Sequence, residues 1–230
     1  GNARTYMDVG NALGHAMVEL HKGTAPASVP PKAGARAGLY QSLPEAMHPG
    51  LDFLLENMPA ADEAALSDAF LAEHIRYAYK VRAELPWAGK LSEDLFLNYV
   101  LPYACLDEKR EPWRKKLYED VVPLVAKSTS VSEAVLILNT KMYEHYGVVY
   151  SKARPKACQG PLETIKAQKA SCTGLSILLV DACRAAGIAA NVVGTPLWSD
   201  GSGNHTWVEV YDDGWKFLGA AESKTLNNGW

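Results

Sequence analysis

The sequence predicts an α+β fold in which a long helical region precedes a small antiparallel sheet. Apolar residues recur at threes and fours over residues 49–127, and an almost wholly apolar helix follows Cys172. After residue 186 the period of the pattern falls toward two, which indicates short strands. With 230 residues and 48% apolar side chains, the chain is long enough to bury a core. We expect a helical region over residues 1–127 and a core over residues 128–230.

The helical region begins with residues 3–21, whose apolar side chains have a mostly helical spacing and predict one amphipathic helix. Residues 23–38 are rich in Pro, Gly and Ser, so they predict a linker or an ordered loop. Farther along, Ser92 is a candidate N-cap, because its hydroxyl can accept from the free amides of a helix start. Ser130 and Glu133 form a candidate capping box for the next helix.

The predicted core is built on the helix that starts at Cys172. This helix is apolar nearly all round, since Leu175–Val180 leave little polar face, and we expect it to lie centrally against the sheet. Gly187 closes it, because glycine adopts the left-handed turn that commonly ends a helix. Three strands are predicted, over residues 188–193, 205–211 and 215–221, with Asp213 and Gly214 as a two-residue hairpin turn.

Cys172 is the candidate nucleophile. The free amides and the dipole at a helix N-terminus favour the thiolate, which is the form of the side chain that attacks. The small neighbours Ser171, Thr173 and Gly174 let a substrate carbonyl approach the sulfur and the backbone amides, which can serve as an oxyanion hole. Cys183 lies among apolar residues of the same helix, and we interpret it as a core residue.

His205 is the candidate base. It opens a predicted strand on which Trp207, Glu209 and Tyr211 share its face. An imidazole at the start of a strand, after a glycine-containing loop, is well placed to reach the N-terminus of a helix packed on that sheet. We therefore expect the imidazole of His205 to lie within reach of the sulfur of Cys172.

In this order, the Cys-helix, the His-strand and the hairpin resemble the transglutaminase-like superfamily. The matching motifs are a small residue before Cys172-Thr-Gly, the run from Leu178 to Ala190 leading into a strand, and His205-Thr-Trp-Val-Glu-Val-Tyr followed by Gly-Trp. A weaker resemblance to bacterial members with a helical lead-in extends it over roughly the last 140 residues. The resemblance implies a papain-like core over residues 128–230, with a central Cys-bearing helix packed on a small antiparallel sheet. It also implies that Cys172 is the nucleophile and His205 the base.

The sequence departs from the family at the third catalytic position. Members usually carry Asp four residues after the hairpin Trp, and this chain has Gly219 there. A two-residue turn would put Glu222 opposite His205, where its carboxylate could orient the imidazole, whereas a three-residue turn would put Ala221 there. Without a carboxylate at His205, activity should fall because the wrong imidazole tautomer is not excluded.

Four further side chains are candidates for contacts with the substrate. Gln159 and Gln168 lie upstream of Cys172, where papain-like enzymes often keep an amide donor for the oxyanion. Trp198 and Trp207 are candidate walls of a substrate groove, although a tryptophan on a half-buried sheet is more often part of the core.

Composition excludes several classes of protein. A formal net charge of −3, from 23 basic and 26 acidic side chains, gives no reason to expect a nucleic acid or an anionic membrane as partner. No apolar run is long enough to span a membrane. Four cysteines at irregular spacing predict neither a zinc site nor a disulfide framework, so we expect no metal and no cofactor.

The ends of the chain bear on its location. The start at Gly1, without an initiator Met, indicates an added start or a removed targeting segment, and we favour a secreted or periplasmic location over a cytoplasmic one. No terminal element follows Asn227, so the C-terminus is a candidate point of truncation.

The leading functional hypothesis is a cysteine hydrolase or acyltransferase that acts on amide or acyl bonds of a peptide or protein, with peptidase-like hydrolysis favoured. The alternative is a catalytically impaired module that binds peptide or glycan, and it is motivated by Gly219 at the position of the acid. The sequence leaves the oligomeric state open.

Overall fold

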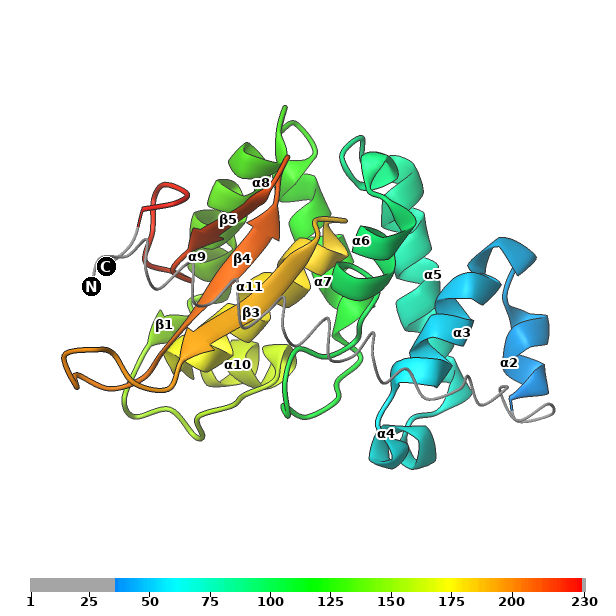
Figure 1. Cartoon of the computed structure of the whole chain (residues 1–230), viewed down its shortest axis with the longest axis horizontal. Helices are drawn as coiled ribbons and strands as arrows, with labels where there is room; N and C mark the ends of the chain where they lie inside the picture. The colour runs from blue at the N-terminus through cyan, green and yellow to red at the C-terminus, as the bar shows by residue number, and fades with distance from the viewer. Residues whose placement is uncertain (1–35, 229–230) are drawn as a thin grey trace. The chain divides into compact units, whose positions relative to one another are not determined.

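The computed structural model describes residues 36–228, in which helices precede a three-stranded antiparallel sheet (Figure 1). The predicted α+β class is therefore confirmed. The helix predicted over residues 3–21 and all but the end of the linker predicted over residues 23–38 lie outside the described residues. The helices of the first half are α2 (Ala37–Ser42), α3 (His48–Asn57), α4 (Ala60–Ala65), α5 (Asp68–Glu84), α6 (Glu93–Tyr99) and α7 (Trp113–Val125), with 3₁₀ turns η1 (Glu45–Met47) and η2 (Ala88–Lys90).

Side-chain caps start two of the predicted helices. The hydroxyl of Ser92 accepts from the amide of Leu95 at the start of α6. Ser130 accepts in the same way from Glu133 at the start of α8 (Val131–Ile137). The returning carboxylate of Glu133 binds the amide and the hydroxyl of Thr129, one residue earlier than a capping box requires. The contact of Ser130 with Glu133 thus forms as predicted, whereas the returning contact of Glu133 goes to Thr129 instead of Ser130.

The second half alternates short helices with strands. After α8 come the π-helical turn η3 (Leu138–Met142), α9 (Tyr143–Tyr146), β1 (Val149–Tyr150), α10 (Pro161–Ala167), β2 (Lys169–Ala170) and α11 (Cys172–Ala185). The strands β1 and β2 form a parallel pair that the sequence pattern did not predict, because two residues are too few to show a period.

The three predicted strands form one sheet in the order β3 (Ala190–Thr195), β4 (His205–Tyr211), β5 (Trp215–Leu218). The bounds of β4 agree with the prediction, while β5 is shorter than predicted. Tyr211 pairs with Trp215, so the hairpin turn has three residues and the predicted two-residue turn is wrong. Within this turn Asp213 and Gly214 both have positive φ, of 55° and 130°.

Helix α11 lies between the sheet and α7, as the sequence predicted for its apolar surface (Figure 1). Every residue from Gly174 to Ala185 is buried. One apolar cluster joins α7, η3 and α11 to β4 and β5, and a second joins α3, α5 and α6 to Ala189. The first cluster takes side chains from both sides of residue 127, and the division there stays a prediction. Among the described residues, no helix has the length and apolar character that a membrane crossing requires.

Candidate functional site

Cys172 is the first residue of α11, and its side chain is partly exposed. The N-cap Ser171 accepts from the amide of Gly174 at 3.1 Å and donates its own proton to the carbonyl of Ala157. The amides of Cys172 and Thr173 have no acceptor within the helix, as is general for a first turn. They are therefore available to a developing oxyanion beside the sulfur.

Two hydrogen bonds join the first turns of α11 to the start of β4. The hydroxyls of Thr173 and Thr206 are 3.0 Å apart, and Ser176 donates to the carbonyl of Thr206 at 3.2 Å. Thr173 follows Cys172 and Thr206 follows His205 in the chain, so the structure brings these two segments together. From the sequence Thr173 was expected only as a small neighbour of Cys172, and neither Ser176 nor Thr206 was singled out, since Ser and Thr also occur on buried helices and strands without a functional role.

His205 has a carboxylate neighbour. Its Nε2 lies 3.6 Å from Oε2 of Glu222, with side-chain exposures of 14% for the histidine and 41% for the glutamate. The imidazole is thus largely shielded from water, while the carboxylate keeps one side in solvent. A carboxylate at this distance from one ring nitrogen favours one orientation of the imidazole.

The route by which Glu222 reaches His205 differs from the predicted one. Continuing the observed pairing beyond Leu218 would place Ala221 opposite His205, as expected for a three-residue hairpin turn. Instead β5 ends at Leu218, and the chain turns back on itself at Gly219. The amides of Glu222 and Ser223 both donate to the carbonyl of Gly219, at 3.2 Å each. This turn, and not the strand register, carries Glu222 to the imidazole.

Residues 120–220 match the family described as the transglutaminase-like superfamily. The match includes Cys172 and His205 and ends two residues before Glu222. This segment of the chain is therefore similar to the transglutaminase-like superfamily. A solved structure of a candidate cysteine protease from Cytophaga hutchinsonii is similar over 60% of this chain and 45% of its own, with 21% sequence identity and a TM-score of 0.46. The chain thus spans less than half the length of that protein. No curated protein gave a significant sequence match.

The two glutamines that the sequence predicted near Cys172 have different surroundings. Gln159 is buried, donates to the carbonyl of Lys169 at 3.1 Å and packs near Gly174 in the first turn of α11. Gln168 is exposed and donates to the carbonyl of Tyr146 at 3.0 Å. Of the two, Gln159 lies against the segment that bears Cys172, and Gln168 joins the end of α10 to the end of α9.

The two tryptophans predicted as groove walls lie beside the imidazole. The ring of Trp198 lies 6.0 Å from that of His205 and 6.2 Å from that of Trp207, with planes tilted by 27° and 11°. Trp198 comes from the loop between β3 and β4, and Trp207 from β4 itself. Their role as walls of a substrate groove stays a prediction.

The other cysteines are held as thiols. Burial raises the pKa of Cys183 and of Cys105 well above the usual range. Burial, together with a hydrogen bond to Asp107, raises the pKa of Cys158 to about 12. Cys158 is partly exposed like Cys172, but its raised pKa makes it a poor reference for the reactivity of Cys172.

One group of side chains in the described part of the chain has ligand atoms close enough for a metal ion. Cys105, Glu108 and Asp181 place these atoms within 4.8 Å of one another. The guanidinium of Arg184 already lies 3.5 Å from the sulfur of Cys105 and 3.7 Å from Oδ1 of Asp181. Both oxygens of Glu108 accept backbone amides, from Cys105 and Leu106. This cluster therefore has its cation in Arg184, and we interpret it as a structural ion pair.

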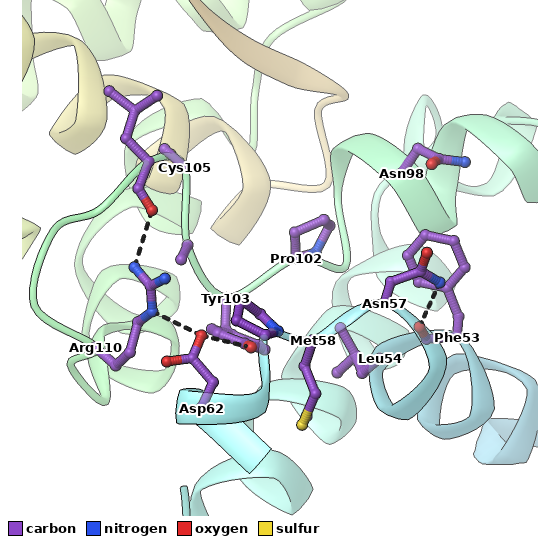
Figure 2. Close-up of a pocket in the computed structure, with 13 residues that line it drawn as sticks. Phe53, Leu54, Asn57, Met58, Asp62, Asn98, Pro102, Tyr103, Cys105 and Arg110 are labelled. Carbon is purple, nitrogen blue, oxygen red and sulfur yellow. Dashed lines mark hydrogen bonds and ion pairs between the residues drawn. The ribbon is translucent and has the colours of Figure 1, made fainter. Parts of the chain in front are cut away.

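A cavity of about 320 Å³ opens among α3, α4, α6 and the loop before α7 (Figure 2). At one side Asp62 accepts from Tyr103 and from Arg110, at 2.9 Å each. Its wall meets α11 through Cys105 and Asp181, whose side chains are 3.6 Å apart. Asp181 is nine residues after Cys172, or roughly 14 Å along the axis at about 1.5 Å per residue. The cavity is thus separate from the Cys172 segment.

Proposed function

We propose that this protein is a thiol hydrolase that cleaves amide bonds of a peptide or protein substrate. Cys172 is the nucleophile, His205 the base and Glu222 the carboxylate that orients the imidazole. The observation that carries the proposal is the 3.6 Å approach of Glu222 to His205, on a strand hydrogen-bonded to the helix of Cys172. The match of residues 120–220 to the transglutaminase-like superfamily supports the assignment of the thiol.

The reaction follows from these roles. His205 takes the proton of Cys172, and the thiolate attacks the carbonyl carbon, whose oxygen gains the negative charge. The amides of Cys172 and Thr173 donate to that oxyanion. The tetrahedral species then collapses to a thioester as the amine leaves with the proton from His205. A water molecule, deprotonated by His205, attacks the thioester and releases the carboxylic acid and the free thiol.

Transfer to an amine is the same chemistry with a different acceptor. An amine that replaces water in the second half of the reaction would give a new amide. Hydrolysis is the favoured outcome because water is always present at a site with a half-exposed carboxylate.

A catalytically impaired module that binds peptide or glycan is the second candidate. It is favoured by Gly219 at the position where the family usually carries Asp, and by the exposure of Glu222 to water. The parallel rings of Trp198 and Trp207 would then serve binding alone.

Alkylation by iodoacetamide at pH 6 separates the two candidates. If the thiol centre is active, mass spectrometry should find Cys172 modified at least tenfold faster than free glutathione in the same solution, and this excess should be lost in His205→Ala. Modification of Cys172 no faster than that of glutathione would exclude the thiol enzyme and favour the binding module.

The reaction type needs a separate assay. Cleavage of casein should be measurable with the wild-type protein and absent in Cys172→Ala. Incorporation of dansylcadaverine into casein, without cleavage, would instead identify an acyltransferase. A protein that passes the alkylation test but does neither acts on a different acyl bond.

A further inference from the structure

Asn139 is a buried polar residue that the proposed chemistry does not use directly. It lies in the π-helical turn η3 and is 4% exposed. Single π-turns within helices are frequent at functional sites, because the wider turn redirects a side chain. Here the π-helical turn lies between α8 and α9, and the three elements follow one another without a gap in the chain.

All the hydrogen bonds of this side chain go to the turn that carries Glu222. Nδ2 of Asn139 donates to the carbonyls of Gly219 and Ser223, at 3.0 and 2.9 Å. Its Oδ1 accepts from the amide of Ala221 at 2.8 Å. The carboxamide thus fills three of its four hydrogen-bonding positions with backbone groups of one short segment.

These contacts enclose Glu222 on both sides in the chain. Ala221 precedes it, Ser223 follows it, and the carbonyl of Gly219 that Asn139 binds also accepts from the amide of Glu222. Ala221 has a positive φ of 61°, a conformation that a residue with a side chain rarely adopts unless its surroundings impose it. Asn139 supplies that constraint through the Ala221 amide.

We infer that Asn139 is a positioning residue that holds the carboxylate of Glu222 at His205. The inference rests on the proposed function of Cys172, His205 and Glu222. The family's usual acid would project from position 219, on the continuation of β5. In this chain position 219 is glycine, the strand ends, and Asn139 fixes the turn that delivers a carboxylate from position 222 instead.

A double-mutant cycle tests this inference through the pH profile of Cys172 alkylation by iodoacetamide. Glu222→Gln should change the profile, and Asn139→Ala should reproduce that change. The double variant should then differ from either single variant by less than twofold at each pH. Thr140→Ala is the matched control, because Thr140 lies on the same π-turn and bonds only within the helix, to the carbonyl of Leu136.

The outcomes have different meanings. An Asn139→Ala variant that folds and keeps the wild-type profile overturns the inference, as does an effect that simply adds to that of Glu222→Gln. A wild-type protein whose Cys172 reacts no faster than free glutathione would instead remove the proposed function itself. The two failures are therefore distinguishable.

Folding of the variants is the remaining control. If Asn139→Ala does not fold, Asn139→Asp retains the acceptor for Ala221 but loses both donated bonds, and it should give the same altered profile. Hydrogen exchange on the wild-type protein is independent of any variant. The amides of Ala221, Glu222 and Ser223 should be protected, and exchange at the rate of an unstructured peptide would overturn the inference.

Discussion

Nε2 of His205 and Oε2 of Glu222 lie 3.6 Å apart, although the two residues are not paired in the sheet. The strand β5 ends at Leu218, and the carboxylate comes from the turn beyond it. Most of the expected behaviour of the site depends on this contact.

Replacement of Glu222 by Gln should lower kcat/KM for casein cleavage by about 10- to 100-fold, which lies at or below the low end of what acid–base groups contribute. The loss is limited because the carboxylate is 41% exposed, and water screens its charge. Steady-state kinetics would measure it, with Glu119→Gln, an exposed glutamate of α7, as control. Unchanged kcat/KM would mean that Glu222 has no part in the reaction.

The contact between Thr173 and Thr206 should stabilise the junction of α11 and β4. Each single replacement by Val keeps the shape but removes one hydroxyl, and should lower the free energy of unfolding by about 0.5–1.5 kcal/mol. The double variant should lose less than the sum, since neither hydroxyl is then left alone. Urea unfolding of the wild type, the two single variants and the double variant gives the coupling free energy between the two hydroxyls. Strictly additive losses would contradict the predicted contact.

His74 should make the fold sensitive to acid. It is fully buried, and its Nδ1 accepts from Arg114 at 3.2 Å. Burial, and then the charge of Arg114, lower the pKa of His74 well below 6.5. In the unfolded chain the imidazole takes up a proton near pH 6.5, so the stability present above that pH is lost as the pH falls.

The free energy of unfolding should fall by up to about 1.4 kcal/mol per pH unit below the pKa that His74 has in the unfolded chain. Urea unfolding between pH 7 and 5 would measure it, and His74→Gln should show a shallower dependence even if it is less stable throughout. Parallel curves for the two proteins would contradict the assignment.

Arg184 should be needed for stability. Its guanidinium contacts Asp181 at 3.7 Å and donates to the carbonyl of Ala104 at 2.8 Å, in a buried site. Replacement by Met should cost about 3–5 kcal/mol, because Asp181 then loses its buried partner. Adding Asp181→Asn should recover part of the loss in thermal unfolding. A double variant less stable than Arg184→Met would argue against the ion pair.

Much of the fold could be predicted from the sequence because its signals are local. The apolar surface of the helix from Cys172, the caps at Ser92 and Ser130, and the alternation of β4 each depend on residues close in the chain. The pair β1 and β2 was missed for the opposite reason, since its hydrogen bonds join residues about 20 positions apart in strands of two residues.

The hairpin of β4 and β5 shows why the register of the strands was harder to predict than the strands themselves. A two-residue turn would have put Trp215 and Phe217 on the buried face, which their hydrophobicity favours. In the structure Leu218 is buried and Trp215 is 41% exposed, packed edge-on against Tyr99 and Tyr211. Tyr99 belongs to α6, so this partner of Trp215 is distant in the chain and no local pattern contains it.

The contact of Glu222 with His205 was predicted through the wrong turn, and Asn139 was not predicted at all. An asparagine within a helical run gives no sign that its partners lie 80 residues away. Such a residue becomes visible only when the turn it binds is known. The division at residue 127 and the roles of Gln159, Trp198 and Trp207 stay predictions.

A carboxylate that projects from a turn is easy to exchange in evolution. Residues 219–223 lie beyond the end of β5 and outside the ladder of β3, β4 and β5, so changes there need not alter the pairing of the strands. We therefore expect homologues to gain or lose the acidic partner of the histidine more readily than they alter the sheet, so that active and inactive paralogues can share one scaffold.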